Sequence, residues 1–464
     1  VKTPAGISEI FDEISYDKGG SILRMLEDFL GEDVFRDGLR KYLSDHKYGN
    51  ATTQDLWAAF EQVSGKPVKR MMNVWIKQVG YPIVTWEGSE LVQGRFMHEG
   101  VSDSIWPIPL SIKTDQKRIS QLMDKKRIKF DVDGKWVKLN FGQKGYYRVQ
   151  YTDGMLEKLK GLIENKKLPS VDRWGIENDM YALCAANKMP ASKYLEIIKW
   201  YWNDDDYLVC HDIEDGLYAI YLLSSKERFW PEVKAYSREY LTHVISRLGW
   251  EPGKGEKHTD ALLRSSTILQ LGRVDDKKAL SFASKKFDAF MKDNDSLHAD
   301  LRGIVYSLTA WQGDRKTYGT LKDLYIKSTT QEEKRRFLSS MSGFRDEKLL
   351  LKTLDFSLSP QVRVQDTFVP IAIAAANPYS RDILWPWIKE NWGELHERYS
   401  VAKNLLGRII DTVSILADDK KEAEVRKFFE QHPAKGTEMT VRQMLERLKI
   451  NARFVENLRQ SYSV

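Results

Sequence analysis

The 464-residue chain has few cysteines and no long apolar run, and each absence excludes a class of protein. Two cysteines, Cys184 and Cys210, cannot build a disulfide scaffold or a four-cysteine zinc site. We expect both to be free, buried thiols in a reducing compartment. The longest apolar stretch, around 370–376, is far shorter than the ~20 residues that span a bilayer. With no signal-peptide pattern either, we expect a cytoplasmic protein with no membrane contact.

An excess of one charge is missing as well. The chain has 72 Lys and Arg against 66 Asp and Glu, a net charge of +6 with the two signs interspersed. Nucleic-acid binding usually needs a concentrated basic face, so we expect no nucleic-acid partner. A hydrophobic content of 42% fits a globular protein, and the length predicts two to four domains. The chain starts Val1-Lys2 without an initiating Met, so we expect it to have been cut from a longer protein.

Catalytic signatures are scarce. Zinc hydrolases commonly carry H-E-x-x-H on a helix, but no two of the eight histidines lie within five positions of each other. His98-Glu99 and His396-Glu397 start the motif, and serines take the place of the second histidine. No G-x-S-x-G elbow, P-loop or G-x-G-x-x-G is present. The chain therefore has no recognisable catalytic metal site, nucleophile or phosphate loop of its own.

The apolar pattern changes period twice along the chain. Residues 5–80 have helical spacing, with Gly31 ending one helix, Asp33 capping the next, and Thr53 providing the capped start of a third. Residues 81–152 alternate, as in Ile108-Leu110-Ile112, and predict a small antiparallel β-sandwich. Asp133-Gly134 between two alternating runs predicts a hairpin.

Residues 153–464 return to helical spacing, with prolines at segment edges and no repeat of fixed length. Consecutive helices without strands favour an irregular α-solenoid of HEAT or armadillo-like type. The predicted fold is therefore mainly α with a small β-sandwich, in three regions: 1–80, 81–152 and 153–464.

One tyrosine stands out. Tyr16 precedes Gly19-Gly20 where a helix begins, and two glycines inside a helix cost ~1 kcal/mol each relative to alanine. A lone tyrosine on a helix is usually a core residue. The glycines instead suggest that something approaches the helix closely there. A neutral phenol can also stabilise an oxyanion by donating a hydrogen bond.

The segment Phe11-Asp12-Glu13-Ile14-Ser15-Tyr16-Asp17-Lys18-Gly19-Gly20-Ser21 resembles the stretch that follows the zinc ligands in the aminopeptidase N family of zinc metallopeptidases. The resemblance continues through Met72-Asn73-Val74-Trp75, Gly80-Tyr81-Pro82 and Gly145-Tyr146-Tyr147-Arg148-Val149. It reaches the helical region at Asp172-Arg173, Leu248-Gly249-Trp250 and Glu390-Asn391-Trp392. It is thus collinear over almost the whole chain. Within the family, the lack of secretory features, the few cysteines and the high charge suggest a cytosolic, archaeal member similar to the tricorn-interacting aminopeptidases.

This resemblance implies the C-terminal portion of a zinc aminopeptidase. Residues 1–80 would end a thermolysin-like catalytic domain, followed by the β-sandwich and a superhelical domain that restricts access to short peptides. Tyr16 would be the catalytic residue that donates a hydrogen bond to the oxyanion. The zinc ligands and the general base would precede Val1, in an upstream catalytic portion, so we expect the chain alone to be inactive. The resemblance also makes a larger protease assembly a candidate partner.

Two other interpretations stay open. The chain could be a stand-alone helical-repeat interaction protein, although a pure scaffold has no need for Tyr-x-x-Gly-Gly at a helix start. A nucleic-acid-binding solenoid would need basic residues concentrated on its concave face.

Overall fold

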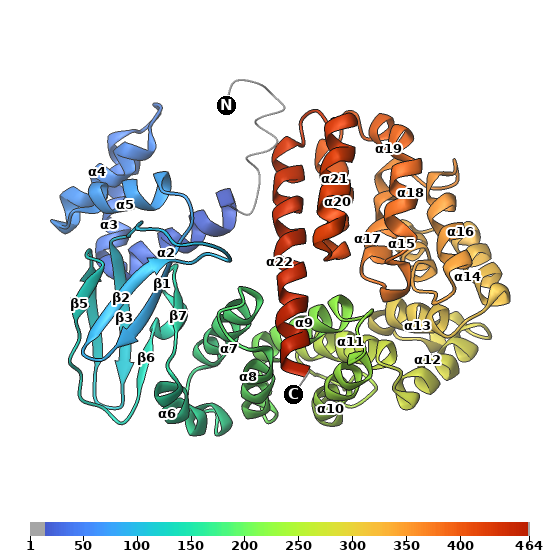
Figure 1. The fold of residues 1–464 in the computed structure, drawn as a ribbon, viewed down its shortest axis with the longest axis horizontal. Helices are drawn as coiled ribbons and strands as arrows, with labels where there is room; N and C mark the ends of the chain where they lie inside the picture. Colours follow the sequence, from blue (N-terminus) through green and yellow to red (C-terminus); the bar gives the residue numbers. More distant parts are fainter. Residues whose placement is uncertain (1–13, 463–464) are drawn as a thin grey trace. The chain divides into compact units, whose positions relative to one another are not determined.

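The computed structural model of the chain describes residues 14–462 (Figure 1). Backbone contacts divide these residues into two compact units, with the boundary between Ala186 and Asn187. The chain is mainly helical with a small β region, as the sequence predicts. The predicted division into three domains at residues 80 and 152 stays a prediction, because the contacts place both regions and the next two helices in one unit.

Four helices open the first unit, after a π-helical turn at Ile14–Lys18. They are α2 (Gly19–Leu30), α3 (Glu32–Asp45), α4 (Thr53–Ser64) and α5 (Val68–Lys77). The apolar stripes expected from the sequence are buried, for example Met25, Leu26 and Trp75. Helical spacing therefore identified this part of the core correctly.

Two predicted helix starts need correction. Gly31, with φ of 91°, ends α2 and is also the N-cap residue of α3. Asp33 therefore cannot be the N-cap of α3. Asp33 lies in the first turn of α3, where its carboxylate accepts from Arg36 at 2.7 Å. Thr53 is the first residue of α4, and Thr52 occupies the cap position.

The β region forms two small sheets. One has the order β5 (Arg127–Lys129), β2 (Glu90–Arg95), β1 (Pro82–Glu87), β7 (Arg148–Gln150). The other has the order β4 (Arg118–Met123), β3 (Ile108–Thr114), β6 (Val137–Leu139). The expectation of purely antiparallel pairing was wrong, because β1 and β7 pair in parallel. The intervening strands and loops supply the long crossover connection that a parallel pair requires.

The predicted hairpin at Asp133-Gly134 was also wrong. β5 pairs with β2 in one sheet and β6 pairs with β3 in the other, so the segment between them crosses from sheet to sheet. The Lys135 backbone N–H donates to Asp115 Oδ1 at 2.9 Å, which holds the crossing segment against the β3–β4 turn. The two-residue hairpin loop is Gly88-Ser89, where Gly88 has a φ of 58°.

Helices α6 (Asp153–Glu164) and α7 (Ser170–Ala185) complete the first unit. The Thr152 hydroxyl caps α6 by accepting from the Met155 backbone N–H. Asp172, near the start of α7, is buried, and its Oδ1 accepts from the Gly142 backbone N–H at 2.7 Å. This bond fixes α7 against the loop that precedes β7.

The second unit consists of helices joined by short loops. They are α8 (Ala191–Ile198), α9 (Tyr207–Leu223), α10 (Trp230–Leu248), α11 (His258–Arg273), α12 (Lys277–Phe290), α13 (Ala299–Trp311), α14 (Arg315–Lys327), α15 (Gln331–Met341), α16 (Glu347–Leu358), α17 (Phe368–Ala375), α18 (Leu384–Glu390), α19 (Trp392–Arg398), α20 (Lys403–Thr412), α21 (Asp419–Gln431) and α22 (Glu438–Tyr462).

One layer of this unit is continuous. The helices α9, α11, α13, α15, α17, α20 and α22 each contact the next in that order. The last of them, α22, drawn in red in Figure 1, also contacts α8, drawn in green. The buried Tyr194, Tyr306 and Met444 belong to helices spread along this unit. The end of the chain therefore packs against the beginning of its own unit.

Candidate functional site

Tyr16, the one site residue predicted from the sequence, lies in the π-helical turn just before α2. Its side chain is 63% exposed, so it is not a core residue of the described chain. A Cβ added at Gly19 or Gly20 would meet no atom within 4 Å. Nothing that the structure describes therefore needs glycine at these positions, and the helix start is open to an approaching group.

A cavity of about 310 Å³ adjoins the same helix. Ser21 and Arg24 of α2 form one side of it. Asp17 lies on the same helical face as these two residues, four positions before Ser21. Its carboxylate acts electrostatically on Tyr146, whose pKa is raised mainly by burial. The other walls come from the loop before β7, from Tyr81 and from α7, and include Lys144, Tyr146, Arg148, Trp174, Asn178 and Asp179.

The deepest charges of this cavity are paired. Arg148 donates to Asn178 Oδ1 and, at 3.3 Å, to Asp179 Oδ1. The other Asp179 oxygen accepts from the Val149 backbone N–H at 3.2 Å. Burial raises the pKa of Asp179 to about 6, opposed by the positive charges of Arg148 and Lys138. The strand β7 and the helix α7 are therefore joined by a buried, hydrogen-bonded ion pair.

The described residues do not fit a catalytic zinc ion. Across residues 14–462 there is no group of three or more His, Cys, Asp or Glu side chains arranged to hold a metal. Cys184 and Cys210 are buried free thiols, as predicted, and burial raises the pKa of both, that of Cys210 to about 11. Thiols with raised pKa values are poor metal ligands and poor nucleophiles.

Comparison with known proteins identifies the class. Residues 1–75 match the Peptidase family M1 domain, and residues 136–450 match the ERAP1-like C-terminal domain. The chain belongs to the family of M1 aminopeptidases, of which it contains the C-terminal portion. The predicted family is thereby confirmed.

Individual relatives cover nearly the whole chain. Aminopeptidase M1-A of Oryza sativa subsp. japonica is 34% identical over 98% of this chain and 54% of its own length. Tricorn protease-interacting factor F2 of Thermoplasma acidophilum is 34% identical over 97% of this chain and 55% of its own length. Glutamyl aminopeptidase of Mus musculus is 29% identical over 99% of this chain and 51% of its own length. The chain thus spans about half the length of the curated relatives it matches.

The sequence predicts Tyr16 as a site residue, which stays a prediction, and it does not indicate the cavity beside α2. Gly145-Tyr146-Tyr147-Arg148-Val149 and Asp172-Arg173 were noted as family landmarks with no site attached. The feature of these segments that could have indicated the cavity is the presence of charged residues among apolar ones. Burying Arg148 and Asp179 is costly unless they pair, so charges at core positions indicate contact between their elements.

Proposed function

We propose that this chain is the C-terminal portion of an aminopeptidase that removes N-terminal residues from short peptides. The single observation that carries the proposal is the family match along the chain, from the peptidase domain to the ERAP1-like C-terminal domain. In this proposal residues 1–80 end a thermolysin-like catalytic domain and residues 81–152 form a β-sandwich. Residues 153–464 form a HEAT or armadillo-like superhelical domain.

In the proposed reaction, Tyr16 donates a hydrogen bond from its phenol to the oxyanion that develops at the scissile carbonyl. Its exposure of 63% and the open helix face at Gly19 and Gly20 support this role, because a substrate can reach the phenol. One such donor is worth about 2.7–4 kcal/mol of transition-state stabilisation in other enzymes.

We propose that the zinc ions of this family are held by the upstream catalytic portion, and that this chain alone is inactive. Apolar side chains of the first helices that are exposed here, Leu23, Leu43 and Ile76, support a covering partner on these helices. Large exposed apolar side chains gathered on neighbouring helices usually mark an interface.

Two further parts of the proposal concern the partner and the cellular location of the protein. One relative is named as a tricorn protease-interacting factor, which supports a larger protease assembly as a partner. The two reduced, buried cysteines support a cytoplasmic location. In the described part of the chain, no helix has the length and apolarity to cross a bilayer.

The test reunites this chain with its upstream portion and compares Tyr16→Phe with Tyr48→Phe. Tyr48 is 99% exposed and lies between α3 and α4, so it is a matched control. We expect Y16F to lower turnover of an aminoacyl substrate by about 10²–10³-fold with unchanged zinc content, and Y48F to leave it unchanged. Equal turnover in both variants would remove Tyr16 from the catalytic machinery.

A further inference from the structure

The cavity beside α2 has a net positive lining. Three cations face it, Arg24, Lys144 and Arg148, against one carboxylate, Asp179. Arg148 and Asp179 neutralise each other through their ion pair at 3.3 Å. Two positive charges of the lining therefore remain for a ligand, those of Arg24 and Lys144, and the Asp17 carboxylate, which is not part of the lining, offsets them in part.

These two cations are weakly engaged by the protein. Arg24 Nη2 donates to the Gly142 carbonyl at 3.4 Å, a long hydrogen bond. Within residues 14–462, the Lys144 ammonium has no ion pair or hydrogen bond. A cation that has no internal partner and borders a cavity is placed to attract an anion, and its attraction grows where aromatic walls exclude water.

The walls of the cavity are aromatic. Tyr81 and Tyr146 lie with ring centroids 5.5 Å apart, and Trp174 of α7 lines the same space. Such rings prefer stacked or edge-to-face contact with another flat ring. The volume of about 310 Å³ is at the small end of ligand pockets, which suits a single ring bearing one charged group.

The loop that forms the floor is held in place before any ligand arrives. The Asn140 amide donates to the Gly145 and Tyr147 carbonyls at 3.0 and 3.2 Å, and its oxygen accepts from the Gly145 N–H. Gln143 lies against Gly175 so closely that a Cβ there would come within 1.6 Å of Gln143 Nε2. Fixed walls lower the conformational entropy lost on binding, so the cavity is a prebuilt site.

We propose that this cavity binds a small aromatic carboxylate. Its carboxylate lies between Arg24 and Lys144, and its ring lies against Tyr81, Tyr146 and Trp174. The site goes beyond the proposed peptidase function and does not depend on it, because every residue involved belongs to this chain. Since Arg24 lies on α2, a bound ligand also ties the start of this helix to the loop at 140–145.

The test measures benzoate binding to the full chain by titration calorimetry, with benzamide and inorganic phosphate as comparison probes. We expect millimolar or tighter benzoate affinity, weaker binding of both comparison probes, and a loss of about 10-fold or more in Arg24→Gln and in Lys144→Gln. Lys135→Gln, an exposed lysine on the crossing segment after β5, is the matched control and should bind as the unchanged chain does.

Hydrogen exchange locates the ligand. Benzoate should slow amide exchange at Gly19–Met25 and at 140–146 in the unchanged chain and in K135Q, and should not do so in K144Q. Absence of binding, equal affinity for benzamide, tighter binding of phosphate, or protection confined to other segments would each overturn the proposal. Unchanged affinity in both R24Q and K144Q would overturn it as well.

Discussion

Gly38 shows how a single residue can set the approach of two elements. It is buried on α3, and a Cβ there would come within 2.3 Å of Phe60 Cδ1 of α4. The Phe60 ring stacks on Phe35 with centroids 4.7 Å apart, so it has little room to move aside. The glycine is therefore required by the packing of α3 on α4, in contrast to Gly19 and Gly20.

We predict that Gly38→Ala destabilises the chain by about 1–3 kcal/mol, the usual cost of overpacking a core. The matched control is Gly161→Ala in α6, where an added Cβ meets no atom within 4 Å. That change should stabilise by up to ~1 kcal/mol through helix propensity. Urea unfolding followed by circular dichroism measures both, and equal stabilities of the two variants would contradict the close packing at Gly38.

Glu214 of α9 is a buried acid whose carboxyl oxygens lie within hydrogen-bond distance of the Ser266 and Thr267 hydroxyls. Burial raises the pKa of Glu214 to about 8, opposed by hydrogen bonds from Thr267 and Ser266. Thr267 Oγ1 lies 2.7 Å from the Leu263 carbonyl and 2.5 Å from Glu214 Oε1. The single hydroxyl proton of Thr267 thus has two acceptors within reach, the Leu263 carbonyl and the Glu214 carboxyl group.

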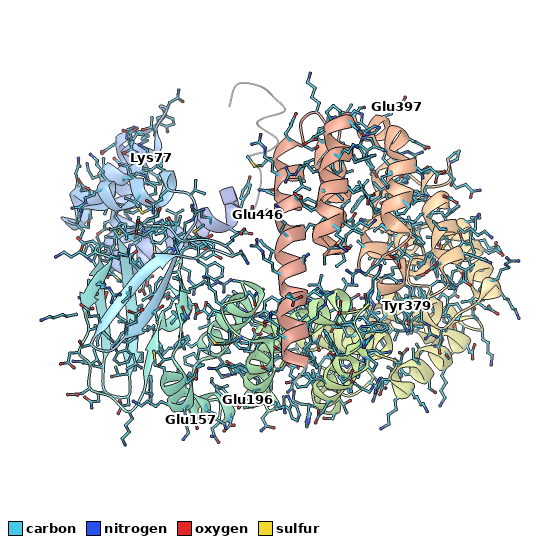
Figure 2. The ribbon with its side chains drawn as sticks, viewed as in Figure 1. Lys77, Glu157, Glu196, Tyr379, Glu397 and Glu446 are labelled. Carbon is cyan, nitrogen blue, oxygen red and sulfur yellow. The ribbon has the colours of Figure 1, made fainter. Side chains whose placement is uncertain are left out.

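The raised pKa of Glu214 predicts that the stability of the folded chain falls as the pH rises. Between the usual value of 4.5 and about 8, the folded chain keeps a proton on Glu214 that the unfolded chain releases. The stability from this group is full below pH 4.5 and falls by ~1.4 kcal/mol per pH unit until it is lost near pH 8. Glu214→Gln, with a neutral amide, should remove this slope, whereas exposed Glu157→Gln (Glu157 is labelled in Figure 2) should keep it. Urea midpoints at pH 6.5 and pH 8, above the pKa of Asp179, give the comparison, and a fall in stability as steep in E214Q as in the unchanged chain would contradict the assignment.

Among single residues, the Tyr16 assignment rests on a local signal, a tyrosine three positions before a glycine pair, and it stays a prediction. The cavity could not be predicted in this way, since Arg24 lies more than a hundred residues before Lys144 and Trp174 in the sequence and meets them only through the fold. The apolar spacing of α2 alone does not tell whether a cation such as Arg24 borders a cavity or lies on a solvated face. That depends on which distant segments pack against α2.

At the scale of elements, helices were predictable and strand partners were not. The stripe of buried residues in α5, with Met71, Met72 and Trp75, follows from spacing of 3.6 residues. Strand alternation picked out the buried Ile108, Leu110 and Ile112 of β3, but Pro109 and Ser111 on its other face are buried too. Alternation also left open which strand lies beside β3. Asp133-Gly134 fits a tight turn locally, yet β5 and β6 belong to different sheets. Partners of strands depend on contacts far along the chain, which a local turn signal does not contain.

The N-cap of α12 gives a testable prediction at the scale of a single helix. The Asp276 carboxylate accepts from the backbone N–H groups of Lys278 and Ala279 at 3.0 and 2.9 Å, and so caps α12. We predict that Asp276→Ala destabilises the chain by about 1 kcal/mol and that Asp276→Asn, which keeps an accepting oxygen, costs a few tenths at most. Chemical denaturation measures both. Equal losses for alanine and asparagine would show that charge, and not capping, is what Asp276 contributes.

At the scale of the helical unit, closure distinguishes this fold from an open solenoid. In an open array each repeat contacts its neighbours alone, and the ends stay apart. Here α22 returns to α8, and Phe229 at the start of α10 stacks on Tyr462 with centroids 4.5 Å apart. Tyr379 (labelled in Figure 2) adds a second internal link, with its ring 6.2 Å from Trp230 and 5.5 Å from Trp311. The sequence predicted the stacked helices, but closure joins segments more than 230 residues apart and has no periodic signature.

Asn457 of α22 makes a buried polar contact at this closure. It is buried, its amide donates to the Met189 carbonyl at 2.8 Å, and its oxygen accepts from the Ala191 N–H at 3.1 Å. We predict that Asn457→Ala destabilises the chain by about 1–3 kcal/mol for each backbone group left unpaired. The matched control, exposed Asn404→Ala on α20, should stay within ~0.5 kcal/mol. Hydrogen exchange should further show that N457A speeds opening of α22 and of α8 together, because each end loses the partner that holds it. Protection in α8 that is unaltered while α22 opens would mean that the two ends are held independently.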